Sequence, residues 1–151
     1  MTDYKLLMAQ MKETVQADPW YVPALSNVSA LLMEALPDLN WAGFYILRGG
    51  QLVVGPFQGK PACIHIPLGG GVCGTAFQRD EPQNVPDVHA FPGHIACDSA
   101  SNSEMVIPLH KDGKPVAVMD LDSPAFARFT GEDEAGLSAI AGMMEQLISW
   151  E

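Results

Sequence analysis

The sequence predicts one domain of the α+β class, with a central antiparallel sheet, helices packed on one face and functional loops on the other. Three observations support this prediction: helical periodicity at both ends, turn-linked strand patterns in the middle, and a length of 151 residues. We therefore treat residues 1–151 as one domain. Its N-terminal helices are expected over about 3–36, its sheet and loops over about 40–124, and its C-terminal helix over about 130–150.

Apolar residues at helical spacing place three long helices. The first is expected between Asp3 and Asp18, and its stripe is Leu7, Met11 and Val15. Pro19 and Pro23 break the chain, and a second helix then runs to about Pro37, with the stripe Leu25, Val28, Leu32 and Leu36. The last helix is expected to begin at Thr130 as N-cap, because Asp133 follows three residues later as a capping-box partner.

Alternating segments joined by glycine turns predict the sheet. "NWAGFYIL" and "QLVVGPF" flank Gly49–Gly50, and "SEMVIPLH" and "PVAVMDLDS" flank "KDGK", so each pair reads as a hairpin. "CIHIPL" and "QNV" are shorter strand candidates, and "GVCGTAFQRD" is expected to form a short helix. The irregular stretch of roughly Pro56–Asn102 should cover the face opposite the long helices, where sites tend to lie.

The charge balance and hydropathy exclude several function classes. The chain has 8 basic and 18 acidic residues, a net charge of −10, which disfavours nucleic acid and anionic membrane as partners. No apolar run reaches the roughly 18 residues of a membrane span, and the N-terminus reads as an amphipathic helix and not as a signal peptide. The simplest compartment is therefore the cytoplasm, and a cationic or zwitterionic small ligand fits the charge.

Three carboxylates are expected at one end of the last hairpin. Side chains alternate along a strand, so Asp120 and Asp122 share a face, and a pairing of His110 with Pro115 puts Glu104 opposite the neighbourhood of Leu121. The two aspartates could simply be an exposed strand end. Alternatively, the group binds an ammonium ion or donates a proton, because crowded buried acids have raised pKa values.

Two aromatic residues share a face of the first strand. Trp41 and Tyr45 lie on either side of Gly43, which leaves space between two large rings. They could be an ordinary core stripe. They could also wall a recess suited to a methyl group or a polarised sulfur atom.

The cysteines Cys63, Cys73 and Cys97 allow three interpretations. They could be inert core residues, which suits Cys73 in the expected short helix. Cys63 and Cys97 could bind zinc together with His65 and His94, although neither spacing is that of a zinc finger. They could instead perform thiol redox chemistry, in which one thiolate is the nucleophile and a second thiol resolves the oxidised product.

Several long stretches, in order along the chain, resemble the free methionine-(R)-sulfoxide reductases, a family built on the GAF fold. These stretches are "NWAGFY", "GPFQGKPACIHIPLGGGVCGTA", "VPDVHAFPGHIACDSASNSE", "IPL" and "DLDSP", between Asn40 and Pro124. All three cysteine positions of the family are present. The resemblance implies a GAF-like domain, no bound cofactor or metal, and a homodimer.

The resemblance also implies roles for the candidate residues. Cys97 would be the nucleophile that attacks free methionine-(R)-sulfoxide, and Cys63 would resolve the sulfenic acid as a disulfide that thioredoxin resets, with NADPH as the electron source. Cys73 would be an auxiliary or alternative resolving thiol. Substrate-binding positions would be Trp41, Tyr45, Glu104, Asp120 and Asp122, and Glu104 and Asp122 would also help to protonate the sulfoxide oxygen.

The residues themselves are compatible with this chemistry. A leaving sulfoxide oxygen needs a proton donor, a free amino acid brings an ammonium that suits carboxylates, and amides in the loop Asp98–Ser103 could bind its carboxylate. The R preference comes only from the resemblance. The main alternative is a ligand-sensing GAF module without catalysis.

Overall fold

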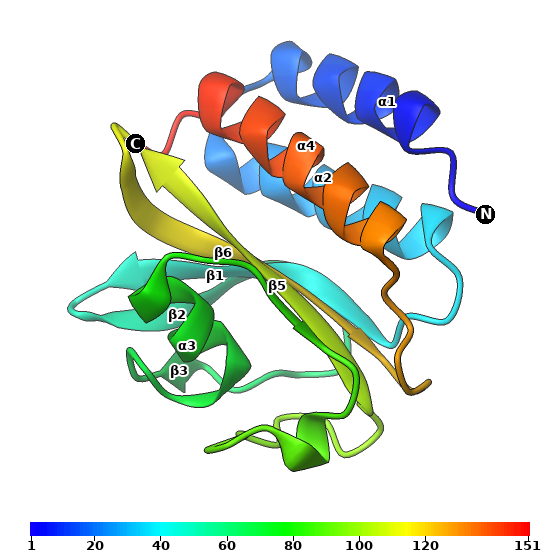
Figure 1. Cartoon of the computed structure of the whole chain (residues 1–151). Helices are drawn as coiled ribbons and strands as arrows, with labels where there is room; N and C mark the ends of the chain where they lie inside the picture. Colours follow the sequence, from blue (N-terminus) through cyan, green and yellow to red (C-terminus); the bar gives the residue numbers. More distant parts are fainter.

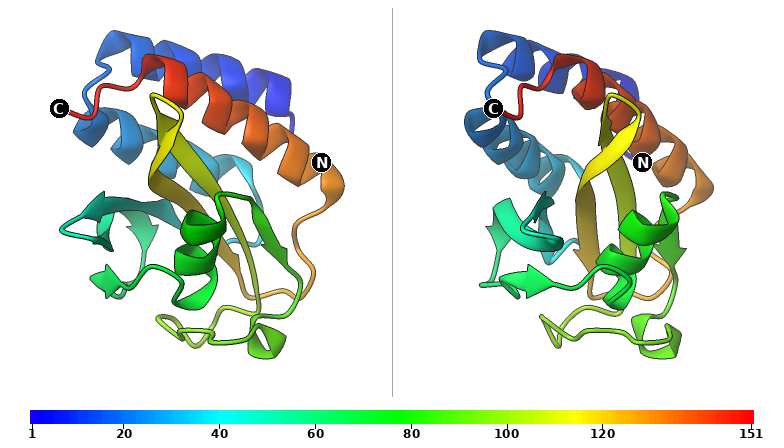
Figure 2. Two further views of the ribbon diagram at one scale, coloured as in Figure 1. Left: turned by 60° about the vertical axis from the view of Figure 1, so that its left-hand side comes forward. Right: turned by 90° about the vertical axis from the view of Figure 1, so that its left-hand side faces the viewer.

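The computed structural model describes all 151 residues and confirms the α+β architecture. Three helices, α1 (Tyr4–Ala17), α2 (Tyr21–Ala35) and α4 (Gly131–Leu147), form one layer above the sheet (Figure 1). α2 and α4 contact the strands directly, and α1 packs on both of these helices. The short helix α3 (Gly71–Arg79) and the long loops lie on the opposite face, which the turned views also show (Figure 2).

All neighbouring strands of the six-stranded sheet pair antiparallel, in the order β3-β2-β1-β6-β5-β4. The strands are β1 (Trp41–Arg48), β2 (Gln51–Gly59), β3 (His65–Ile66), β4 (Gln83–Val85), β5 (Ser103–Lys111) and β6 (Lys114–Ser123), and a short 3-10 turn spans Val88–Ala90. Both predicted hairpins form, since Arg48 pairs with Gln51 and Lys111 with Lys114. The third strand is shorter than "CIHIPL" predicts, because proline follows it at Pro67 and cannot donate to a ladder.

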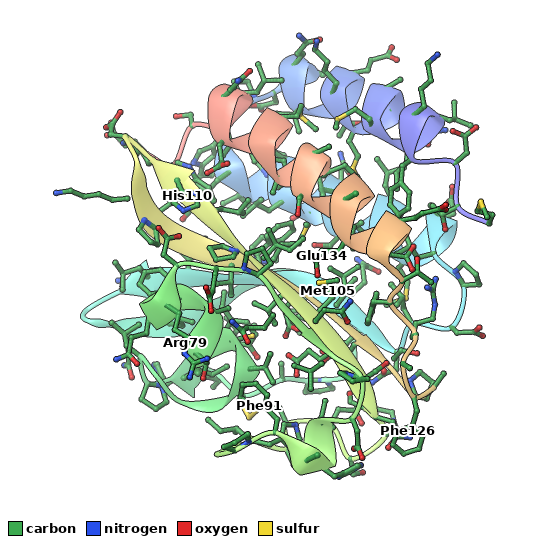
Figure 3. All side chains as sticks on the ribbon, viewed as in Figure 1. Arg79, Phe91, Met105, His110, Phe126 and Glu134 are labelled. Carbon is green, nitrogen blue, oxygen red and sulfur yellow. A yellow bond between two sulfur atoms is a disulfide. The ribbon has the colours of Figure 1, made fainter.

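Each face of the sheet has its own core. The face under the helices buries 22 residues, including Met119 and Leu121 of β6, while the other face buries a smaller cluster that includes Val118. Figure 3 shows the same division, with Met105 beside the helix layer and Phe91 among the loops. Asp120 and Asp122 share a face of β6, as the sequence predicts, and the structure places that face on the loop side.

The helix boundaries differ from the sequence prediction at two places. α2 begins before Pro23, which lies in the first turn, where the missing N–H has no intrahelical partner to lose. α4 has the predicted capping box of Thr130 and Asp133, but it ends at Leu147 because Ser149 bonds instead to Pro19 and Tyr21. None of these helices has the length and apolar character needed to cross a membrane.

Candidate active site

The β5–β6 register brings three carboxyl groups together. A bulge between Leu109 and His110 shifts the pairing by one residue, so Glu104 lies directly opposite Asp122, the neighbour of Leu121. Asp120 is two residues back on the same face of β6 and pairs with Val106. The predicted gathering at one end of the hairpin is confirmed, and its register is corrected by the bulge.

Burial keeps these carboxyl groups from ionising at their usual pH. Asp120 is 4% exposed and Glu104 is 7% exposed. Burial first, and then the charge of Asp122, raises the pKa of Asp120 to about 8. Burial likewise raises the pKa values of Glu104 and Asp122 well above the usual range, and neighbouring carboxylates add to both shifts. The group therefore holds protons at neutral pH, as a proton donor must.

Trp41 and Tyr45 form an aromatic wall beside the acids. Their ring centroids lie 5.8 Å apart with an interplanar angle of 25°, and Phe57 stacks on Trp41 at 5.1 Å. The gap predicted over Gly43 is closed, because a Cβ there would lie 2.3 Å from the Phe57 Cβ and 2.9 Å from the Trp41 ring. The rings therefore present one continuous wall, and no recess separates them.

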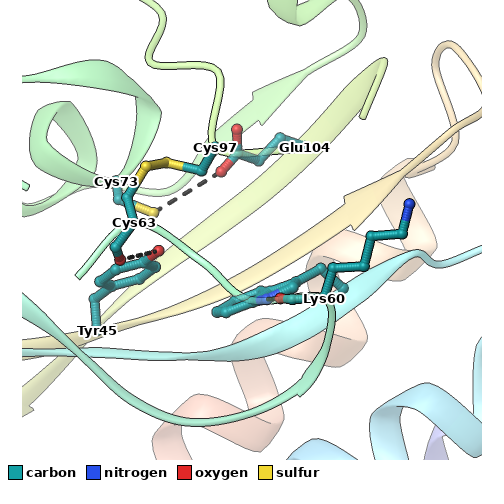
Figure 4. Close-up of a disulfide and its surroundings, with 7 residues drawn as sticks. Tyr45, Lys60, Cys63, Cys73, Cys97 and Glu104 are labelled. Atoms are coloured by element: carbon teal, nitrogen blue, oxygen red, sulfur yellow. Dashed lines mark hydrogen bonds between the residues drawn. A yellow bond between two sulfur atoms is a disulfide. The ribbon is translucent and has the colours of Figure 1, made fainter. Parts of the chain in front are cut away.

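Cys63 and Cys97 are joined by a disulfide, with their Cα atoms 5.4 Å apart (Figure 4). Both residues are partly exposed. Cys63 lies on the segment before β3, and the Tyr45 hydroxyl donates to its carbonyl oxygen at 3.1 Å. Cys97 lies on the long loop before β5. The disulfide thus links two loops that meet over the site face of the sheet.

The third cysteine, Cys73, is a buried free thiol on α3. Its Sγ donates a hydrogen bond to Glu104 Oε2 at 3.8 Å, which Figure 4 marks with a dashed line. Burial and the neighbouring carboxylates raise the pKa of this thiol well above its usual range. Cys73 is therefore a neutral thiol within the acid group, in contrast to the loop cysteines.

The zinc set considered from the sequence does not assemble in this structure. Cys63 and Cys97 bond to each other, and His65 lies exposed on β3. The side chains of metal-ligand type that do converge are Cys73, Glu104 and Asp120, whose ligand atoms lie within 4.8 Å of one another.

One pocket joins these features. It has a volume of about 520 Å³, counted to the open solvent, and its lining includes the aromatic wall, the three acids, Cys73 and Cys97. The N-terminus of α3 borders it at Gly70 and Gly71.

The comparison with known proteins agrees with this geometry. The GAF domain family matches residues 4–148. An Escherichia coli free methionine-R-sulfoxide reductase is 50% identical over 147 residues, covering 97% of this chain and 85% of that protein. This chain belongs to the GAF-domain family of free methionine-R-sulfoxide reductases.

Solved structures of the family have the same fold. The reduced form of Staphylococcus aureus fRMsr matches with a TM-score of 0.95 and 46% identity, covering 99% of this chain and 97% of that chain. The free methionine-R-sulfoxide reductase of Neisseria meningitidis, solved in complex with its substrate, matches with a TM-score of 0.91 and 40% identity, covering 95% and 86% respectively.

Two hydrogen bonds that the sequence did not predict hold the Cys97 loop in this GAF family member. The Asn40 side-chain amide donates to Asp98 Oδ2 at 2.9 Å and to Ser101 Oγ at 3.0 Å. Asn40 directly precedes β1, so a polar residue between a turn and a buried strand was the available signal. Its amide fixes the loop that carries Cys97 to the start of β1, an interior strand of the sheet.

From the sequence, backbone amides of the loop Asp98–Ser103 are expected to bind a substrate carboxylate, but three of them already donate hydrogen bonds within the chain. Ala100 N–H donates to Asp98 Oδ1 at 2.9 Å, Ser101 N–H to the Asp98 carbonyl, and Asn102 N–H to the Ser123 carbonyl. These three amides therefore hold the loop together and do not face a ligand. The amides of Asp98 and Ser99 have no acceptor within the chain.

Proposed function

We propose that this protein reduces free methionine-(R)-sulfoxide to methionine with its own cysteines. The observation that carries the proposal is the Cys63–Cys97 disulfide at a pocket that also contains three acids, of which Glu104 and Asp120 are buried and Asp122 is partly buried. The substrate and its epimer are inferred from the reductases of Escherichia coli and Neisseria meningitidis that resemble this chain. Sulfoxide reduction requires two thiols that supply electrons and nearby acids that protonate the sulfoxide oxygen, and this pocket contains both.

In the first step, the Cys97 thiolate attacks the sulfoxide sulfur. A carboxyl proton from Glu104 or Asp122 passes to the sulfoxide oxygen, which makes the sulfur more electrophilic. The oxygen is then transferred to the Cys97 sulfur while the sulfur–oxygen bond of the substrate and the transient sulfur–sulfur bond break, so methionine leaves and Cys97 becomes a sulfenic acid. The two electrons gained by the substrate come from the Cys97 sulfur.

In the second step, the Cys63 thiol attacks the sulfenic sulfur of Cys97. Water leaves with the oxygen, and the disulfide of this structure forms. Thioredoxin then reduces the disulfide by thiol–disulfide exchange, with NADPH as the source of electrons, so the reaction needs no bound cofactor. Such recycling belongs in the cytoplasm, where thiols are kept reduced.

Substrate recognition follows from the charges around the pocket. An entering ammonium lowers the pKa of the nearest carboxyl, so one acid of the group can ionise while another keeps its proton. Asp120 suits the ionised role because its pKa of about 8 is the closest to neutral pH. Trp41 and Tyr45 would contact the methyl end, and the unengaged amides of Asp98 and Ser99 suit the substrate carboxylate.

Cys73 has a different role in this proposal. A buried thiol of raised pKa is a poor nucleophile, because the thiolate is the reactive form. Its hydrogen bond to Glu104 makes it part of the proton-donating group. Cys63 is therefore the resolving thiol, and Cys73 is auxiliary.

The decisive experiment is thioredoxin-coupled NADPH oxidation with the separated epimers of free methionine sulfoxide. We expect turnover with the R epimer and not with the S epimer or with peptide-bound methionine sulfoxide, whose ammonium and carboxylate are masked. Absence of turnover with the R epimer would leave the sensor module as the better explanation. The homodimer stays a prediction, which sedimentation of the purified protein tests.

A further inference from the structure

Cys73, Glu104 and Asp120 bring three metal-ligand atoms into one pocket from α3, β5 and β6. Each of these atoms lies within 4.8 Å of the other two, and Cys73 Sγ is 3.8 Å from Glu104 Oε2. Zinc bonds to sulfur and oxygen are about 2.3 and 2.1 Å, so the ligand atoms of a tetrahedral site are separated by roughly 3.5 Å. The group therefore needs only small side-chain movements to surround an ion.

A second observation indicates that this place suits a cation. Asp120 is 4% exposed, and its Oδ1 is buried without a hydrogen-bond partner. An unsatisfied buried acceptor costs about 1–3 kcal/mol. No lysine, arginine or histidine pairs with any member of the trio, because the ion pairs of the chain lie elsewhere. The protein thus supplies three ligand residues, one of which has an unpartnered oxygen, but no positively charged side chain to pair with them.

We propose that Cys73, Glu104 and Asp120 form a binding site for a thiophilic divalent cation, such as Zn²⁺ or Cd²⁺. A thiolate with two carboxylates favours these ions over Mg²⁺ and Ca²⁺, which prefer oxygen alone. The ion displaces the Cys73 thiol proton and the carboxyl protons of the site, which pass to solvent, and no atom changes its oxidation state.

The expected consequence is inhibition, and this part rests on the proposed function. Asp120 would bind the ion in place of the substrate ammonium, and Glu104 could no longer hold a transferable proton. The reductase would therefore be inhibited by Zn²⁺ in competition with methionine sulfoxide, and a chelator would restore it. Binding itself does not depend on any activity, which allows the two proposals to be tested apart.

The test uses the oxidised protein, in which the disulfide removes Cys63 and Cys97 as ligands. We expect one equivalent of Cd²⁺ to produce a thiolate-to-cadmium charge-transfer absorption and to release protons, and Zn²⁺ to compete it away. Cys73→Ser should abolish the absorption, and Asp120→Asn should weaken binding at least about tenfold. His65→Ala is the matched control, since His65 lies exposed on β3, and it should bind as the wild type does.

The pH dependence supplies an independent measurement on the unaltered protein. Apparent affinity should rise about tenfold per pH unit for each proton displaced. The proposal is overturned if the oxidised wild type shows no thiolate absorption with Cd²⁺, or if Cys73→Ser retains it. If Cys73→Ser does not fold, an unchanged affinity in Asp120→Asn or a flat pH profile of the wild type overturns it equally.

Discussion

Replacing Asp120 with asparagine should make the protein more stable at neutral pH. Folding buries a carboxyl that ionises freely in the unfolded chain, so the folded state holds a proton that the unfolded state has lost. Because the folded pKa of Asp120 is about 8 and the usual value is 3.8, stability falls as pH rises between these two values. Asparagine has nearly the same shape and cannot ionise, so Asp120→Asn removes this loss.

The size of the gain follows from the difference in proton affinity. Each tenfold difference corresponds to about 1.4 kcal/mol, which gives an upper limit of about 4 kcal/mol at pH 7. Glu104 and Asp122 titrate together with Asp120 and share the cost, so we expect a gain of about 1–4 kcal/mol. The gain should fall to about 0.5 kcal/mol at pH 4, which lies close to the usual carboxyl pKa of 3.8, because the unfolded carboxyl is partly protonated there.

Urea unfolding of the oxidised protein between pH 4 and pH 8 measures this effect. Asp112→Asn is the matched control, because Asp112 lies exposed in the β5–β6 turn with a positive φ of 53° that asparagine tolerates. Its stability should follow that of the wild type at every pH. The reasoning is refuted if Asp120→Asn gives no gain at pH 7, or the same gain at pH 4 and pH 7.

Three further predictions concern the cysteines, the other two acids and a distant histidine. Cys97→Ser should lose all reduction, whereas Cys63→Ser should still form about one methionine per chain in a single turnover but turn over poorly with thioredoxin; full turnover would assign the resolving step elsewhere. Glu104→Gln and Asp122→Asn should each slow the chemical step by roughly 10²-fold in rapid-quench assays, and wild-type rates would make these acids structural. His110 contacts carboxylates of α3's C-cap and of α4, which raise its pKa. Its stabilising effect should be complete below its unfolded pKa and disappear as pH rises through the folded pKa, so His110→Gln should cost about 1 kcal/mol at pH 6 and less at pH 9 in urea unfolding.

The sequence predicted the fold well where one face of an element is buried. The alternation of β6 predicted that Asp120 and Asp122 share a face, and the structure places Met119 on the helix side and Asp120 on the loop side. The end of α4 was not predictable in the same way. Its apolar stripe continues to Ile148, and the contact of Ser149 with Pro19 and Tyr21 that stops the helix is not local in sequence.

The site was predicted less completely, for a physical reason. The gathering of Glu104 and Asp122 followed from the hairpin, but the bulge at Leu109 and His110 that sets their direct pairing has no signal in the sequence. Likewise, a cysteine pattern cannot show that Cys73 is buried beside Glu104, because that depends on how α3 docks against β5 and β6. The local sequence pattern predicts which face of a strand or helix a side chain occupies, whereas its neighbours from other elements depend on tertiary packing.

The acids of the site lie on strands and the redox cysteines lie on loops, and each placement suits the proposed role of those residues. In the proposed reaction, Glu104 and Asp122 hold protons when the substrate binds, and their raised pKa values come mainly from burial against the sheet. The roles proposed for Cys63 and Cys97 instead require contact with the substrate, with each other and with thioredoxin in turn. Glu104 and Asp122 accordingly lie on paired strands, whereas Cys63 and Cys97 lie on partly exposed loops.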